Sequence, residues 1–355
     1  MKKLSLLIAV SLLASTFAAL PALANNYRLT QQQQPPKFGS DEERQAYEAW
    51  FSEKDPAKKF ALAKEFAQKF PQSNFIKYIE GNILSTLGTN FQTALQAFYQ
   101  GPDASKIEKL ITAGDEYLAK QPGQVYILTQ VALATGYGVL GGFYKDIDKS
   151  HSYADKALKL LENPTPPEGF KPDDYAKLRA EGLARLNQYK GLYYLRQATP
   201  DPEQAIVYLT KAAEHKDWST AKDPNTYALR AEANSIIYDK LSAEYRAMTD
   251  KSTDAAKAML TKIDPVVDKM IDDYARLVAL FNKPDTKQQH EAAKGRLEDF
   301  WKYRHEGKLE GMAEYVKRYE ADPTAPPPPS TASTSTPPAS QPSGGNKPNG
   351  RPKGR

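Results

Sequence analysis

An all-α fold of stacked helix hairpins is predicted by three features of this sequence. Between Ser40 and Ala321, apolar residues recur at the three- and four-residue spacing of amphipathic helices. Short polar turns with Pro or Gly separate these stretches, and several of them begin with helix-start signals. Almost no segment shows the strict alternation of a half-buried strand. Helices in series, joined by short turns, bury their apolar faces by packing on their neighbours as hairpins.

The individual helices are predicted from their start and stop signals. Residues 40–43 (Ser-Asp-Glu-Glu) form a capping box ahead of the first apolar face. Asp55-Pro56 combines an N-cap with a proline at the first helical position, and Pro71 follows the end of that helix. Asp264-Pro265 has the same pattern and is predicted to start a further helix. Other long helices are expected near residues 104–120, 173–197, 201–215, 224–247 and 284–303.

Composition limits the classes of function that fit the chain. Its 355 residues are 40% hydrophobic, which is enough for a substantial core, and they include no cysteine. Disulfides, thiolate metal sites and a cysteine nucleophile are therefore excluded. The net charge of +5 comes from basic residues at the two ends, whereas the middle is near neutral. Because nucleic-acid binding needs a clustered basic face on the folded part, we expect no nucleic-acid partner.

The N-terminus has the three-part pattern of a secretory signal. Lys2 and Lys3 precede an apolar run over residues 4–20, and Ala22-Leu23-Ala24 supplies the small residues of a cleavage site. We predict that residues 1–24 are a signal peptide, although a retained membrane anchor is the alternative. The run is short for a spanning helix, so no transmembrane segment is expected after cleavage. The chain is then exported, either periplasmic or secreted, and residues 25–39 form a polar linker.

The other end, residues 323–355, consists mainly of Pro, Ser, Thr, Ala and Gly and contains no aromatic residue and no Leu, Ile, Val or Met. Such a segment cannot offset its ordering entropy by burial, so disorder is predicted. The proline run at 326–329 makes its first part stiff and extended. We interpret the tail as a solubilising extension. The alternative is a weak contact of its basic residues with anionic envelope polymers or lipid headgroups.

A repeat motif is clearest between residues 137 and 166. It reads Tyr137-x-x-Leu140-Gly141-x-x-Tyr144, then Ala154-x-x-x-Leu158-x-x-Leu161, then Pro166. This pattern closely resembles the tetratricopeptide repeat, in which two helices form one hairpin. A small residue at Gly141 would let two helices approach closely, and Leu140 and Tyr144 would share one helix face.

A second unit is similar to the same repeat. It reads Gly191-x-x-Tyr194, then Ala205-x-x-x-Leu209-x-x-Ala212. The sequence departs from the family at Asn187, Lys190 and Asp217, where an aromatic residue, Leu and Pro are usual. The prolines at 71, 122 and 166 lie 51 and 44 residues apart, longer than the family's period of about 34. The repeats are thus irregular, and an all-α fold without a regular solenoid is the alternative.

The resemblance implies a right-handed stack with a concave surface that binds a protein or peptide. The groove-facing positions carried over from the family are Lys145 and Asp146 in the first unit and Gln188 and Arg196 in the second. The predicted function is a non-enzymatic interaction scaffold or adaptor in the bacterial envelope. Two alternatives remain open: an enzyme acting on glycan or peptidoglycan in a helical groove, or a structural envelope protein held by its basic tail.

No catalytic, cofactor or metal site is predicted. Residues 136–141 fit G-x-G-x-x-G, but a dinucleotide site needs a βαβ unit that the sequence does not supply. The four histidines match no metal-binding spacing. Adjacent carboxylates such as Asp272 and Asp273 point about 100° apart on a helix, so they do not make an acid–base pair. The abundant tyrosines are interpreted as packing residues, with a tyrosine-lined groove as the alternative.

Overall fold

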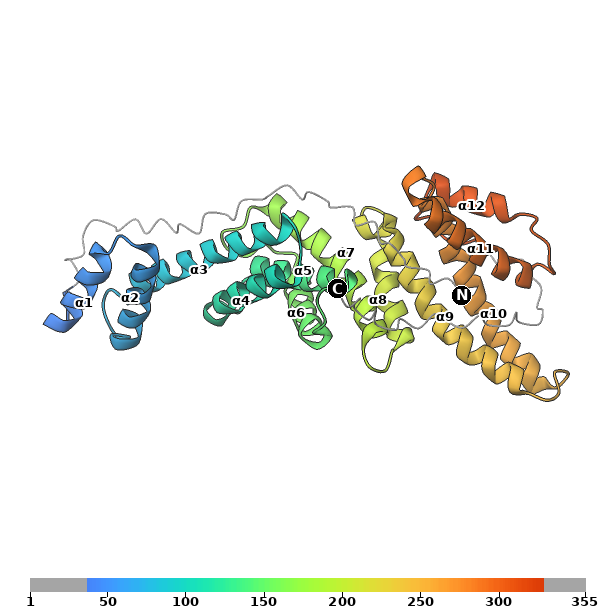
Figure 1. The fold of residues 1–355 in the computed structure, drawn as a ribbon, viewed down its shortest axis with the longest axis horizontal. Coiled ribbons are helices and arrows are strands. Elements are labelled where there is room, and N and C mark those ends of the chain that lie inside the picture. The colour runs from blue at the N-terminus through green and yellow to red at the C-terminus, as the bar shows by residue number, and fades with distance from the viewer. Residues whose placement is uncertain (1–36, 329–355) are drawn as a thin grey trace, which may run out of the picture. The chain divides into compact units, whose positions relative to one another are not determined.

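Helices make up the secondary structure of the described residues, 37–328, in this computed structural model (Figure 1). The all-α prediction is thereby confirmed. The predicted signal peptide, most of the polar linker and the tail from residue 329 onward lie outside the described residues.

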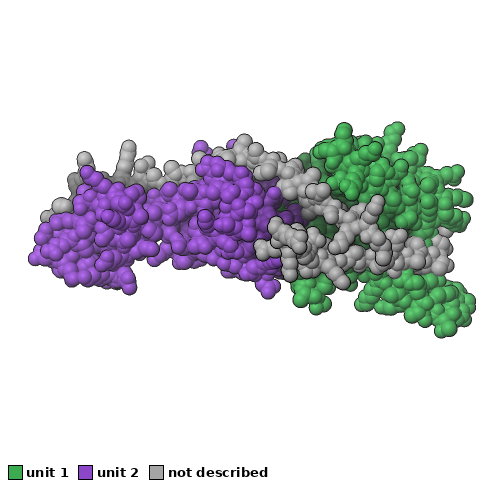
Figure 2. Space-filling model, viewed as in Figure 1, with its two compact units in different colours: residues 1–13, 187–355 green, residues 14–186 purple. Residues whose placement is uncertain are grey.

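The described residues form two compact units (Figure 2). The N-terminal unit, residues 37–186, contains α1 (Asp41–Ser52), α2 (Pro56–Lys69), α3 (Ile76–Tyr99), α4 (Ala104–Lys120), α5 (Val125–Leu140) and α6 (Ile147–Leu161). The C-terminal unit, residues 187–328, contains α8 (Pro202–Glu214), α9 (Pro224–Ala247), α10 (Asp254–Leu280), α11 (Lys287–Arg304) and α12 (Met312–Ala321), with short 3-10 helices at Ser219–Lys222 and Pro284–Thr286. Helix α7 (Pro172–Arg196) begins in the first unit and ends in the second. The single helical domain predicted over 40–322 is thus divided into two units.

Local capping signals explain where the first helices begin. The Ser40 hydroxyl accepts a hydrogen bond from the backbone N–H of Glu43 at 3.1 Å, and the Glu43 carboxylate accepts one from Gly39 at 2.6 Å. Asp55 accepts from the backbone N–H of Lys58 at 2.9 Å. Each bond satisfies a backbone donor at or just before the first turn, where no helical partner exists.

Within each unit, helices that follow one another along the chain pack together. In the N-terminal unit this holds from α1 through α6. In the C-terminal unit, α8 packs on α9, and α10 contacts α9, α11 and α12. The core around α10 is made by fully buried side chains such as Val267, Met270, Leu297 and Tyr319. Helix α10 is therefore the element around which the C-terminal unit is built.

The helix start predicted at Asp264-Pro265 is wrong. Helix α10 begins eleven residues earlier, where the Thr253 hydroxyl accepts from the backbone N–H of Ala256 at 3.2 Å, and it continues through Pro265. A proline removes one helical hydrogen bond, but the fully buried flanking residues Ile263 and Val267 hold the helix against its neighbours. Tertiary packing overrides the local signal at this position.

The stronger repeat motif is also placed differently from expectation. Helix α5 ends at Leu140 with Gly141 as its C-cap, so Tyr144 lies in the following turn and does not share a helix face with Leu140. The close approach to another helix occurs one turn earlier. A Cβ at Gly138 would lie 2.7 Å from the Ile107 side chain of α4. The spacing of the motif is present, but its glycine-mediated helix contact is made by a different glycine.

In the weaker motif, a close helix contact is made at Gly191. A Cβ at Gly191 would lie 2.4 Å from Cγ of Leu209, so the missing side chain lets α7 and α8 approach closely. Leu209 is fully buried, as are Ala205 and Ala212 on the same face of α8. This part of the chain therefore packs as the predicted helix hairpin.

Replacing Gly191 with alanine is expected to lower the free energy of unfolding of the C-terminal unit by about 1–3 kcal/mol, because Leu209 has to shift as a whole. Gly295→Ala in α11 is the matched control. Nothing lies within 4 Å of a Cβ there, so alanine is expected to stabilise by about 0.5–1 kcal/mol. Urea denaturation followed by tryptophan fluorescence checks both changes. Equal stabilities of Gly191→Ala and the parent would contradict the close packing.

Candidate functional site

A row of carboxylates runs along one face of the central helix of the C-terminal unit. Asp264, Asp268 and Asp272 are spaced four residues apart on α10, and Asp273 is adjacent to the last of them. Sequence reasoning missed this row, although the spacing of four residues is a visible signal of a shared helix face. Because Asp264, Asp272 and Asp273 are buried, the row needs positive charge or hydrogen-bond donors from neighbouring helices.

Helix α11 supplies partners for the first two carboxylates. The Arg304 guanidinium lies 2.8 Å from the Asp264 carboxylate and donates to Asp268 at 2.7 Å. The Tyr303 hydroxyl donates to Asp264 at 2.7 Å. Burial and this hydrogen bond to Asp264 raise the pKa of Tyr303. One guanidinium and one hydroxyl therefore tie α11 to α10.

Helix α9 supplies the partner for the most deeply buried carboxylate. Arg230 donates twice to one oxygen of Asp273, from Nε at 2.9 Å and from an Nη at 2.6 Å, and the same Nη lies 3.6 Å from Asp272. Asp273 is fully buried. Burial raises the pKa of Asp273 to about 6, against the opposing effect of Arg230. Burial by itself lowers the pKa of Arg230. The nearby carboxylates of Asp273 and Asp272 have the larger combined effect, so the pKa of Arg230 is raised.

Arg276 connects the row to the segment that follows α12. Its guanidinium donates to the Asp272 carboxylate at 3.2 Å, and also to the backbone carbonyls of Pro323 and, at 2.7 Å, Ala325. Arg318 on α12 donates to the carbonyl of Pro326 at 2.8 Å. We call residues 323–328 the C-terminal strap. Two guanidiniums thus hold three backbone carbonyls of the strap.

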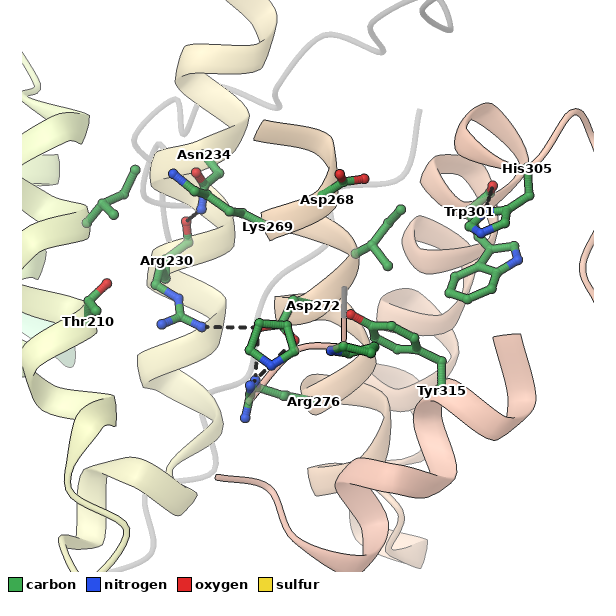
Figure 3. Close-up of a pocket in the computed structure, with 14 residues that line it drawn as sticks. Thr210, Arg230, Asn234, Asp268, Lys269, Asp272, Arg276, Trp301, His305 and Tyr315 are labelled. Carbon is green, nitrogen blue, oxygen red and sulfur yellow. Dashed lines mark hydrogen bonds and ion pairs between the residues drawn. The ribbon is translucent and has the colours of Figure 1, made fainter. Parts of the chain in front are cut away.

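A pocket of about 630 Å³ lies between these elements in the C-terminal unit, and Figure 3 shows its lining side chains. The volume is in the range of ordinary ligand sites. Side chains from α8, α9, α10, α11 and α12 line it together with two prolines of the strap: Ile206, Thr210, Arg230, Asn234, Asp268, Lys269, Ile271, Asp272, Arg276, Trp301, His305, Tyr315, Pro327 and Pro328. The strap therefore forms part of the pocket wall.

Aromatic rings form one side of this pocket. The Trp301 and His305 rings stack with centroids 4.1 Å apart, and Tyr315 meets Trp301 edge-on at 5.3 Å. The indole N–H of Trp301 donates to the carbonyl of Glu310 at 3.2 Å, which fixes the ring. Figure 3 places these three side chains on the same side of the pocket. Rings that are held in this way give a rigid aromatic wall at little entropic cost.

The opposite side of the pocket carries an unsatisfied acceptor. Asn234 on α9 is 1% exposed, and its Nδ2 donates to the carbonyl of Arg230 at 3.0 Å. Its Oδ1 has no hydrogen-bond partner in the described structure, and the residue lines the pocket. A buried acceptor without a partner carries a desolvation cost of about 1–3 kcal/mol. A ligand that offers an N–H or O–H group here would relieve that cost.

The four groove positions predicted from the repeat family lie elsewhere. Lys145 and Asp146 are exposed in the turn before α6, where the Asp146 carboxylate caps the helix by accepting from Lys149 at 2.9 Å. Arg196 is exposed and forms a bidentate ion pair with Glu232, in which its two Nη atoms donate to the two carboxylate oxygens at 2.6 and 2.9 Å. None of the four lines the pocket.

Gln188 was predicted to face a binding groove, and the structure places it in the interior instead. Its side chain is fully buried and donates to Asp223 at 3.1 Å and to the Thr226 hydroxyl at 2.9 Å. It therefore joins α7 to the start of α9 and offers no surface to a partner. An amide in the interior of a helix is indistinguishable by sequence from one on its exposed face unless the helix phase is known.

The motifs considered for catalysis or metal binding are accounted for by the helices. Residues 136–141 lie at the end of α5, so no strand precedes the glycines. Within residues 37–328, no three His, Asp or Glu side chains are grouped closely enough to hold a metal ion. Tyr189 and Tyr193 are buried, in agreement with a packing role.

No helix among the described residues combines the length and apolar character needed to cross a membrane. Comparison with protein-family models, with curated proteins and with solved structures finds no match to this chain.

Proposed function

We propose that this protein is an exported, non-enzymatic adaptor that binds an extended segment of a partner protein in the pocket of its C-terminal unit. The observation that carries the proposal is the strap, because the pocket wall already includes a stretch of the chain's own polypeptide that is held through its backbone carbonyls. Arg276 and Arg318 bind its backbone carbonyls, and Pro327 and Pro328 lie at the pocket wall. A surface that accepts the chain's own backbone has the chemistry to accept another backbone of the same kind.

The carboxylate row supports a binding role better than an acid–base role. The raised pKa of Asp273 would suit a general acid, but this side chain is fully buried and does not line the pocket. Asp272 does line the pocket, and its carboxylate accepts hydrogen bonds from Arg276 and Tyr319. Asp272 thus orients Arg276, which in turn holds a peptide backbone.

Export and the helix-hairpin stack complete the proposal. The signal-like residues 1–24 favour a periplasmic or secreted location, where a protein without cysteine depends on packing alone. The similarity to tetratricopeptide repeats favours protein recognition as the task.

A cross-linked pull-down from envelope extract tests this function. The bait is the full chain after signal removal, and the blocking variant is Ile206→Arg with Thr210→Arg, two half-buried positions of α8 at the pocket. We expect the parent to capture one dominant protein and the blocking variant to lose at least about tenfold of it, because two long cations fill the pocket. Val207→Arg, on the same helix but 45% exposed and outside the pocket, is the matched control. Equal capture by all three baits would show that the pocket is not the binding site.

A further inference from the structure

The strap is held in two different ways along its length. Its first half is anchored: the carbonyls of Pro323 and Ala325 accept from Arg276, and Ala325 packs against the hydrophobic core. In its second half, the carbonyl of Pro326 accepts from Arg318, but beyond it Pro327 is exposed and Pro328 is half-buried at the pocket. Anchoring of one half and light contact of the other is the arrangement expected of a segment whose end can leave the pocket.

The chemistry of the pocket matches a proline-rich segment. Prolines favour the extended polyproline II conformation, in which backbone carbonyls have no internal hydrogen-bond partners and are free to accept from arginine. Arg318 makes this kind of bond to the carbonyl of Pro326. The rings of Trp301 and Tyr315 provide aromatic side chains in the pocket wall, which is the kind of lining that proline-rich segments use.

The pocket also has capacity beyond the two prolines that line it. It continues to Asn234, whose buried Oδ1 has no partner. A proline run has no N–H groups to satisfy this acceptor, whereas a hydroxyl residue beside the run has both an N–H and an O–H. In this chain Ser330 and Thr331 follow the run at 326–329. The complementary ligand is therefore a proline run flanked by Ser or Thr.

We infer that the pocket is a recognition site for proline-rich segments in the polyproline II conformation, and that Pro327 and Pro328 of the chain's own strap compete for it in cis. This inference rests on the proposed function and specifies its ligand and regulation. A partner segment binds by displacing the strap's proline end, so the apparent affinity for a partner is reduced by the tethered competitor. The anchor at Arg276 keeps the displaced end nearby and allows it to return.

The test uses a fluorescent peptide with the sequence of residues 323–338 and the full chain after signal removal. Fluorescence anisotropy measures its affinity for the parent, for Pro327→Ser with Pro328→Ser, and for the Ile206→Arg with Thr210→Arg variant. We expect the double-serine variant to bind about tenfold or more tightly than the parent, because its own strap no longer competes. The blocking variant should not bind the peptide, and Val207→Arg should match the parent.

A second peptide distinguishes recognition of the prolines from non-specific peptide binding. It has serine in place of the four prolines at 326–329 and should bind at least about tenfold more weakly. Equal binding of the two peptides, equal affinity of the parent and the double-serine variant, or no binding to any variant would each overturn the inference. Pocket-dependent capture of a protein without peptide binding would leave the proposed function standing alone. Peptide binding with the expected competition, but without protein capture, would support the inference and count against an envelope partner.

Discussion

Replacing Arg230 by methionine is expected to lower the free energy of unfolding of the C-terminal unit by about 3–5 kcal/mol at pH 7. The change removes the partner that donates twice to Asp273 and leaves a carboxylate that is fully buried. Urea denaturation monitored by tryptophan fluorescence measures the loss. Two of the three tryptophans, Trp218 and Trp301, lie in the C-terminal unit, whereas Trp50 lies in the N-terminal unit.

Two further variants test whether the loss of stability comes from the unpaired buried charge of Asp273. Arg230→Met combined with Asp273→Leu removes both charges and should recover most of the stability, because the main penalty comes from the unpaired charge. Arg196→Met is the surface counterpart, since Arg196 and Glu232 form a similar pair in which both side chains are 41% exposed. It should cost no more than about 1 kcal/mol. If the single and double variants lose the same stability, the burial of Asp273 is not the source of the effect.

Much of the helical framework was predictable because its signals are local. The stretches expected near 104–120, 201–215 and 224–247 correspond to α4, α8 and α9 within one residue at either end. Asp55 and Ser40 act as caps because a side-chain oxygen near a free backbone N–H depends only on the next few residues. The apolar periodicity then determines which face of each helix is buried.

The features that differ from the sequence predictions have a common cause, which is packing between distant parts of the chain. Asp264-Pro265 has a valid local start signal, but the burial of Ile263 and Val267 carries the helix through it. Gln188 was expected in a groove and is fully buried, because its partners Asp223 and Thr226 lie more than thirty residues further along the chain. Sequence spacing does not contain that information.

The candidate site could not be predicted from the sequence because its residues are brought together by packing between distant segments. One local signal of it was present in the sequence. Arg230 and Asp273 are 43 residues apart, and the strap reaches Arg276 from 47 residues away. The row at Asp264, Asp268 and Asp272 did have a readable spacing, but a charged helix face normally indicates exposure to solvent. Only its burial shows that the row is an internal network that positions arginines at a pocket.

The free energy of unfolding of the parent, compared with that of Asp273→Asn, is expected to fall as the pH rises from about 4 to about 6. The native pKa of Asp273 is about 6 and its ordinary value is 3.8, so in this interval the native state keeps a proton that the unfolded state has lost. Stability therefore decreases with pH, and the difference of about 2 pH units corresponds to roughly 3 kcal/mol. Urea denaturation of both proteins at several pH values between 4 and 7 measures the change.

The asparagine variant removes this titration while keeping the shape of the side chain, so other carboxylates cancel in the comparison. A difference between the two proteins that does not change with pH would show that Arg230 fully offsets the burial of Asp273. The same proton links this result to the loss expected for Arg230→Met. Below pH 6 the native carboxyl is already neutral, and removing the guanidinium then leaves no buried anion. The cost of Arg230→Met should therefore be smaller at pH 5 than at pH 7, and it should rise across the interval in which Asp273 ionises.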